Sequence, residues 1–100
     1  MAYDPWDIVV VPFPYTDSQT TKRRPALILS SPALESDHGL VWRAMITSAK
    51  NAPWIGDVAI TDVSLAGLPA PSVVRASKMA TIEASYIVKR LGILTKMINN

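Results

Sequence analysis

Cationic and hydroxyl side chains are the groups in this sequence that could do chemistry, and they fall in three short clusters. The clusters are Lys22-Arg23-Arg24, Thr47-Ser48 and Ser77-Lys78. A planar guanidinium with a hydroxyl group beside it can bind phosphate through charge-assisted, bidentate hydrogen bonds. If Arg24 and Thr47 lie on neighbouring antiparallel strands, the start of one strand meets the end of the other. Both side chains would then share one rim of the sheet, where they could hold a phosphate group.

Other kinds of catalytic site have little support in the sequence. There is no cysteine, so thiol chemistry and disulfides are excluded, and the single histidine, His38, leaves no set of ligands for a typical zinc site. His38 lies in a Ser-Asp-His-Gly turn, where an exposed loop residue is the favoured interpretation. The four glycines are isolated from one another, so no glycine-rich phosphate loop is present. We therefore expect any catalysis to proceed without thiol, metal or other cofactor.

Charge is unevenly distributed along the chain. Residues 70–100 carry five basic side chains and one acidic one, or +4, whereas residues 1–69 carry five basic and seven acidic ones, or −2. The resulting net charge of +2 is too small to indicate nucleic-acid binding by itself. Two basic clusters on a small domain could still form a local phosphate-binding surface. Ordinary solubilising charge is the alternative that the pattern alone favours.

Length and composition predict a single globular domain over residues 1–100. The chain has 100 residues, of which 49% are hydrophobic, and this excludes intrinsic disorder. The longest apolar run, residues 8–13, is interrupted by Pro12 and is far shorter than the roughly 20 residues of a membrane span. No secretory signal follows Met1. We therefore expect a cytoplasmic protein that does not insert into membranes.

Short apolar and β-branched runs separated by turn residues predict a mainly β fold. We expect five or six strands, at residues 7–13, 25–30, 40–48, 57–61, 72–82 and 88–94. The polar segments 16–24 and 31–39, and the segment 65–71, are predicted loops. Such a succession of short strands predicts a small closed or half-closed antiparallel barrel.

Several local features can also be predicted. The fifth strand is expected to bend near residues 76–78, and residues 83–87 to form one helical turn that Thr81 or Ser85 caps. Gly67 is available for a positive φ, and Gly92 suggests a β-bulge in the last strand. The three tryptophans could stack on bases, but we expect at least two of them to pack in the core or at a dimer contact.

The order of several motifs resembles the MazF/PemK family of toxin–antitoxin ribonucleases. The most specific block is Arg-Arg-Pro-Ala-Leu-Ile-Leu-Ser at residues 23–30, and the strand motif Trp-Asp-Ile-Val-Val-Val-Pro-Phe at residues 6–13 is nearly as specific. The similarity continues in the same order through residues 44–48, 72–75, 78–82 and 89–92. It thus extends over most of the chain.

This resemblance implies an SH3-like antiparallel barrel, a homodimer and a metal-independent endoribonuclease that cleaves single-stranded RNA, such as mRNA, at short specific sequences. The products would be a 2′,3′-cyclic phosphate and a 5′-hydroxyl. The family's catalytic arginine falls on Arg24 and its catalytic threonine on Thr47. The resemblance also implies a small antitoxin protein as partner. Around these two residues, we expect four side chains to bind RNA: Lys22, Arg23, Ser48 and Lys78. The general base is left unassigned, Glu83 being a poor candidate.

Three departures from the family pattern bear on these expectations. Many members have glycine where Trp6 stands, and several have glutamine and then a basic residue where this chain has Lys78 and Ala80, so the RNA sequence that is cleaved is not implied. Most members continue into a C-terminal helix, which we expect to be short or absent here. Two alternatives stay open: a non-catalytic SH3-like module that binds nucleic acid or protein, and a toxin that poisons a topoisomerase.

Overall fold

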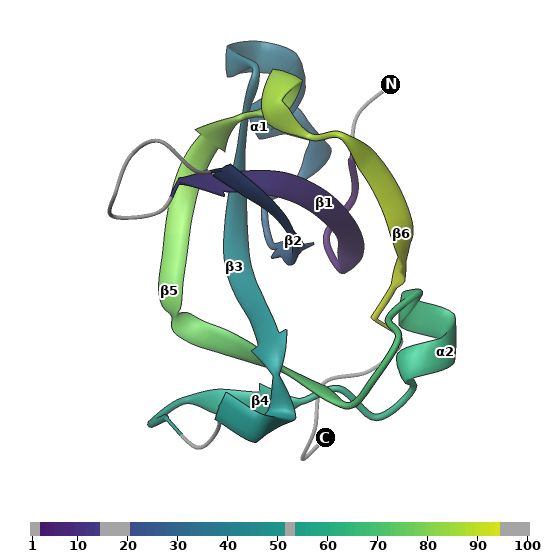
Figure 1. Cartoon of the computed structure of the whole chain (residues 1–100). Coiled ribbons are helices and arrows are strands. Elements are labelled where there is room, and N and C mark those ends of the chain that lie inside the picture. The colour runs from purple at the N-terminus through teal and green to yellow at the C-terminus, as the bar shows by residue number, and fades with distance from the viewer. Residues whose placement is uncertain (1–2, 15–20, 52–53, 95–100) are drawn as a thin grey trace.

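One six-stranded antiparallel sheet forms most of the molecule (Figure 1). The computed structural model describes residues 3–14, 21–51 and 54–94. The strand order is β4-β5-β3-β2-β1-β6, and the strands are β1 (Asp7–Pro14), β2 (Thr21–Ile28), β3 (Leu40–Ser48), β4 (Asp57–Ala59), β5 (Ser72–Glu83) and β6 (Lys89–Ile93). The helices are α1 (Pro32–His38) and α2 (Val63–Ala66), and two 3-10 turns span Ala49–Asn51 and Ala84–Tyr86. The predicted mainly β fold with short helical turns is thus confirmed.

The sheet is curved into a barrel-like shape (Figure 1), and both of its faces are covered by apolar side chains. Successive residues of a strand point to opposite faces, and in β1 Ile8 belongs to one buried cluster while Val9 and Val11 belong to the other. The first cluster also holds Leu27 and Ile46. Strand β1 therefore contributes side chains to both buried clusters. This explains why its sequence is continuously apolar and does not alternate between apolar and polar residues.

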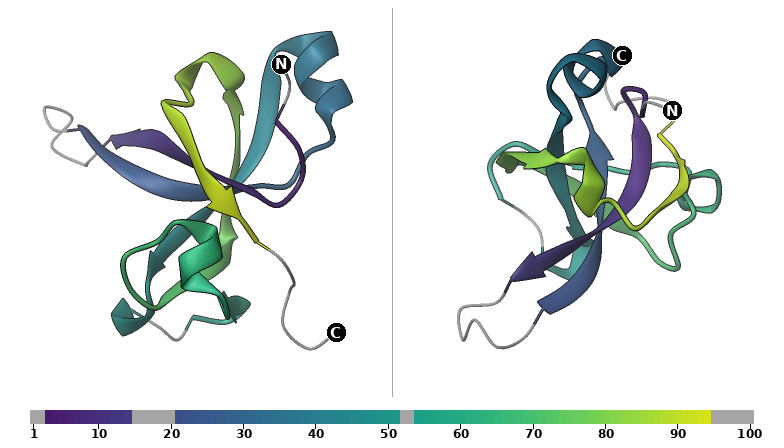
Figure 2. Two further views of the ribbon diagram at one scale, coloured as in Figure 1. Left: turned by 90° about the vertical axis from the view of Figure 1, so that its right-hand side faces the viewer. Right: turned by 90° about the horizontal axis from the view of Figure 1, so that it is seen from above.

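In the described residues no strand ladder joins the edge strands β4 and β6; helix α2, which follows β4, packs on β6 instead. Helix α2 follows β4 closely and lies beside β6 (Figures 1 and 2). This approach requires glycine on both sides, since a Cβ on Gly92 would collide with the carbonyl of Leu65, and one on Gly67 with the carbonyl of Leu91. Gly67 also has the predicted positive φ, at 76°. The two glycines thus allow the end of α2 to pack directly against β6.

Trp6 has a left-handed backbone, with a φ of 77°, directly before β1. Among the non-glycine residues in the described ranges it is the one with a positive φ. Left-handed backbone is unfavourable for a residue with a Cβ, and glycine adopts it at little cost. The conformation gives a physical reason for the glycine that many proteins of the resembling family have at this position.

The predicted bounds of two strands, β2 and β4, are wrong by two residues or more. β2 begins at Thr21 and not at residue 25, so Lys22, Arg23 and Arg24 lie in a strand. They pair with β1 as a hairpin arm, from Pro14 opposite Thr21 to Val11 opposite Arg24. A two-stranded arm that projects into solvent tolerates polar side chains. The polar composition of residues 21–24 therefore did not indicate that they form a strand. Residues 16–20 of the predicted loop lie outside the described residues. Strand β4 ends at Ala59, two residues before the predicted end at residue 61.

The predicted loop 31–39 contains a short helix, and a second short helix, α2, ends inside the predicted loop 65–71. Segment 31–39 forms α1, with Pro32 in the first turn and Gly39 as a left-handed C-cap at φ 71°. Proline at the start and glycine after the end are helix signals that the polar composition concealed. In α2, the side chain of Asp62 caps the helix by accepting a hydrogen bond of 3.0 Å from the Leu65 N–H.

The local predictions for the end of the chain are largely confirmed. The ladder between β3 and β5 passes from Ala44–Met79 to Met45–Arg75, so residues 76–78 bulge out of β5. The register between β1 and β6 shifts next to Gly92. The turn at 84–86 is present, but Glu83 occupies its N-cap position without a side-chain hydrogen bond, so the predicted caps are wrong. Residues 95–100, where a C-terminal helix was in question, lie outside the described residues.

None of the three tryptophans lies in the core. Trp6, Trp42 and Trp54 are 42%, 47% and 48% exposed. Their expected alternative place, a contact between subunits, stays a prediction.

Candidate active site at the ends of β2 and β3

The register of β2 against β3 places Arg24 level with Thr47. Ala26 is paired with Met45, and because the strands are antiparallel, two steps back from Ala26 and two steps on from Met45 lead to the same place. The ladder ends at Ala26, next to Pro25, which has no N–H to donate. The two strands therefore separate where Arg24 and Thr47 face the same space.

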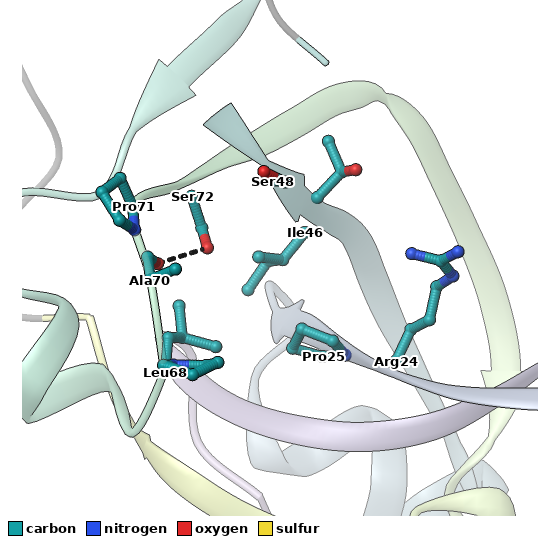
Figure 3. A pocket seen from close by; sticks show the side chains of 10 residues that line it. Arg24, Pro25, Ile46, Ser48, Leu68, Ala70, Pro71 and Ser72 are labelled. Carbon is teal, nitrogen blue, oxygen red and sulfur yellow. Dashed lines mark hydrogen bonds between the residues drawn. The ribbon is translucent and has the colours of Figure 1, made fainter. Parts of the chain in front are cut away.

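That space is a cavity of about 200 Å³. Its walls come from the start of β2, the end of β3 and the segment that leads into β5, and its lining residues are Arg24, Pro25, Ile46, Thr47, Ser48, Leu68, Pro69, Ala70, Pro71 and Ser72. Figure 3 shows Arg24 next to Pro25, with its side chain extending away from the proline along the side of the cavity where β3 ends at Ser48. The lining is mainly apolar, with a guanidinium and hydroxyl groups as its polar part.

The hydroxyl groups of the cavity are held by short-range hydrogen bonds. Thr47 Oγ1 accepts a hydrogen bond of 2.8 Å from Asn51 Nδ2, and Ser48 Oγ accepts one of 3.2 Å from the backbone N–H of Lys50. Ser72 Oγ donates to the carbonyl of Ala70 at 2.9 Å, as Figure 3 shows. In these bonds the Thr47 and Ser48 hydroxyls act as acceptors, so the O–H of each can donate to an acceptor in the cavity.

The charge of the lining favours an anion. Arg24 carries the one charge among the described residues that line the cavity, and no carboxylate is among them. Lys22 and Arg23 are exposed on the same strand. Buried or half-buried cationic donors next to hydroxyl groups are suited to a phosphate group. The arrangement can therefore hold one phosphate and donate several hydrogen bonds to it.

A buried ion pair supports the end of β3 from behind. Arg75 on β5 donates to both carboxylate oxygens of Asp57 on β4, at 3.1 and 2.9 Å, and the two side chains are 7% and 6% exposed. Arg75 Nη2 also donates to the backbone carbonyl of Asn51 at 3.0 Å. The hydrogen bonds from Arg75 lower the pKa of Asp57, and the carboxylate raises the pKa of Arg75. The pair thus joins β4, β5 and the Asn51 turn.

We expect this pair to make the stability of the protein fall in acid. Because the pKa of Asp57 is lower in the native state, the pair stabilises fully above the unfolded pKa of about 3.9, and its contribution is lost as the pH falls through the native pKa. Asp57→Asn should therefore lower the melting temperature most at pH 7, with a smaller difference from wild type near pH 2. Thermal unfolding of both proteins across this range measures it, and a difference that is independent of pH would contradict it.

Sequence-predicted residues outside the cavity lie at two other places. Lys78 is exposed on β5 with Nζ 5.5 Å from the centroid of the Trp54 ring, while the Arg75 guanidinium lies 4.2 Å from the same centroid. Glu83 is paired with Leu40 at the opposite end of β3 from Thr47. Leu40 and Thr47 are seven residues apart, about 23 Å of extended strand at ~3.3 Å per residue, so Glu83 lies too far along the sheet to serve as a base in the cavity. His38 ends α1, two residues before Leu40, and so lies near that same end of β3.

Three supporting residues were missed by sequence reasoning. Arg75 follows two valines in β5, and an arginine within an apolar strand is a signal for a buried ion pair. Its partner Asp57 also accepts a hydrogen bond of 3.0 Å from the Trp54 N–H. No signal in the sequence indicated Asn51. Its side chain reaches Thr47 only because the 3-10 turn that follows β3 has this length.

A comparison with protein-family models finds a match over residues 4–99 with the PemK-like, MazF-like toxins of type II toxin–antitoxin systems. This match extends over nearly the whole chain. The comparison with curated proteins gives no match. In the described ranges, no helix is both long and apolar enough to cross a membrane.

Proposed function

The chain belongs to the PemK-like, MazF-like toxins of type II toxin–antitoxin systems, and we propose that it is an endoribonuclease that cleaves single-stranded RNA without a metal ion. As a type II toxin it has an antitoxin protein as its natural partner. Family membership alone does not define the reaction. The proposal therefore depends on the cavity at the ends of β2 and β3 and on what its side chains can do.

The observation that carries the proposal is the cavity with Arg24, Thr47 and Ser48 in its lining. Its volume of about 200 Å³ is below the roughly 300–1,000 Å³ of cavities that enclose a whole small ligand. A phosphate group of a polymer needs less room, since the rest of the strand lies outside. The size of the cavity thus favours one linkage of an extended chain over a free metabolite.

The proposed reaction is an attack within the RNA strand. The 2′-oxygen of one ribose forms a bond to the neighbouring phosphorus, the bond from phosphorus to the 5′-oxygen breaks, and the 2′-proton leaves while the 5′-oxygen gains one. Negative charge builds on the phosphate oxygens during this exchange, and fixed donors aimed at such charge are usually the largest catalytic contribution. Arg24 supplies two donors and a full charge, and Thr47 supplies a third donor.

Arg24 is assigned as the electrostatic stabiliser and not as the base. A guanidinium keeps its proton at any ordinary pH, so it is poorly suited to proton transfer. The general base that takes the 2′-proton is left unassigned. Lys22, Arg23, Ser48 and Lys78 are proposed to bind the RNA around the reacting phosphate. Because Lys22, Arg23 and Lys78 are exposed, binding should weaken as salt concentration rises.

We also propose that the protein is a cytoplasmic homodimer. An exposed apolar patch on β3 and β5 supports a contact between subunits. Trp42 and Met79 are 47% and 56% exposed. They lie on one face, because Met79 pairs with Ala44, two residues from Trp42.

The test is incubation of the purified protein with a long RNA in the presence of EDTA. We expect a small set of discrete fragments that carry 5′-hydroxyl ends. Thr47→Val has nearly the same shape but no hydroxyl, and it should cleave at least tenfold more slowly. Binding without cleavage at enzyme excess would contradict the proposal and favour a non-catalytic module. Equal cleavage by wild type and variant would place the activity elsewhere.

A further inference from the structure

The side chain of Asn51 contacts the Thr47 hydroxyl directly. Thr47 lies near the end of β3 and is 5% exposed. Asn51 is the last residue of the 3-10 turn Ala49–Asn51 that follows the strand. Asn51 Nδ2 lies 2.8 Å from Thr47 Oγ1. This is a normal length for a good hydrogen bond, so the amide fixes one of the few positions around the threonine oxygen.

The direction of this bond decides where the threonine proton can go. A hydroxyl group has one O–H donor and two acceptor positions, and an amide nitrogen only donates. With Asn51 donating, one acceptor position of Thr47 is occupied and its O–H must point elsewhere. Since Thr47 lines the cavity, the proton is available to an oxygen atom that is bound there. An unrestrained hydroxyl would instead rotate among three staggered positions.

Asn51 is itself held from behind by the Arg75–Asp57 pair. Arg75 Nη2 donates to the Asn51 carbonyl at 3.0 Å and to Asp57 Oδ2 at 2.9 Å. The guanidinium also lies against the Trp54 ring, 4.2 Å from its centroid. A three-residue turn has few restraints of its own, and here β4 and β5 supply them. The chain of contacts from Asp57 to Thr47 is therefore continuous.

We propose that Asn51 is a positioning residue that orients the Thr47 hydroxyl as a donor toward the reacting phosphate. This inference rests on the proposed ribonuclease function, and it adds a residue that acts only through Thr47. Asn51 does not line the cavity, so it need not touch the RNA. Its effect should appear in the rate of the chemical step and not in the affinity for RNA.

The experiment compares Asn51→Asp, Asn51→Leu and Thr47→Val in single-turnover cleavage of one RNA oligonucleotide. Asparagine, aspartate and leucine are similar in size, but aspartate only accepts hydrogen bonds and leucine forms none. Aspartate would draw the Thr47 proton to itself, so Asn51→Asp should be as slow as Thr47→Val. Asn51→Leu leaves the hydroxyl free to rotate and should be about tenfold slower than wild type, part of the roughly 10²–10³ that an aligned donor contributes.

Two readouts separate orientation from a structural or charge effect. The Kd for an uncleavable 2′-deoxy version of the oligonucleotide should stay within about twofold for Asn51→Leu. A charge effect of Asn51→Asp would weaken binding and fade at higher salt, whereas the loss in rate at saturating enzyme should persist. Melting temperatures show whether each variant is folded.

The decisive comparison is a double-mutant cycle. In the Thr47→Val background, Asn51→Asp and Asn51→Leu should change the rate by less than about twofold, because the hydroxyl that they orient is missing. Equal losses in both backgrounds, or wild-type rates for both Asn51 variants, would overturn the positioning role while leaving the ribonuclease function in place. Failure of the wild-type protein to cleave would instead refute the proposed function, and this role with it.

Discussion

Arg24→Ala is expected to slow RNA cleavage by roughly 10²–10³, the usual cost of removing a donor that stabilises charge in the transition state. The loss follows from the place of Arg24, which carries the one charge among the described residues of the cavity lining. Arg24→Lys keeps the charge but not the two parallel donors, so its rate should fall between those of the other two proteins. Single-turnover cleavage at saturating enzyme measures the chemical step for all three.

Arg23→Ala is the matched control for this prediction. Arg23 is the neighbouring arginine on β2, exposed, and not among the lining residues. Neighbouring side chains in a strand point to opposite faces, so Arg23 should contribute to RNA affinity in a salt-dependent way and little to the chemical step. Equal losses in the chemical step for Arg23→Ala and Arg24→Ala would show that general positive charge, and not the cavity, accounts for the activity.

Ile46→Ala is expected to lower the free energy of unfolding by about 2–5 kcal/mol. Ile46 is fully buried in the first core cluster and also forms part of the cavity lining. Removing three of its carbons leaves a hole in this core cluster that the surrounding side chains fill only in part. Since domains of this size are stable by roughly 5–15 kcal/mol, the loss is a large share of the total. Urea unfolding measures it.

Ile55→Ala makes the same chemical change at a residue that is 98% exposed. Its unfolding free energy should stay within about 0.5 kcal/mol of wild type. A similar loss in both variants would mean that Ile46 does not occupy the core as described. Cleavage by Ile46→Ala should also fall, because Ile46 immediately precedes Thr47 on β3 and supports the cavity from within.

The strands were largely predictable because their apolar runs are buried on both sides of the sheet. β3 has the predicted bounds, Leu40–Ser48. Its start is marked by the change from the polar segment that ends at Gly39 to an apolar run, and its end by the polar pair Thr47-Ser48. The charged arm of β2 was not predictable, because residues 22–24 pair only with β1 and their side chains are exposed (Lys22, Arg23) or half-buried (Arg24). Helix α1 was missed for a related reason: none of its residues is buried, so no apolar periodicity marks it.

The site divides in the same way. Arg24 and Thr47 could be placed together from the order of strands, because adjacent antiparallel strands bring a beginning and an end to one rim. The support behind them depends on contacts between segments far apart in sequence, such as Arg75 with Asp57. Asn51 reaches Thr47 only because the strand is followed by a tight 3-10 turn. Such a turn carries no sequence pattern of its own.

Cleavage of an RNA oligonucleotide in which one ribose is replaced by deoxyribose tests most directly whether the cavity promotes attack by a 2′-hydroxyl. The oligonucleotide is first cleaved in EDTA in its all-ribose form to locate the broken bond, and the ribose on the 5′ side of that bond is then replaced. We predict a 2′,3′-cyclic phosphate from the first and no cleavage at that bond in the second, with binding retained. Cleavage of the substituted bond, or its absence in both oligonucleotides, would contradict the proposed reaction.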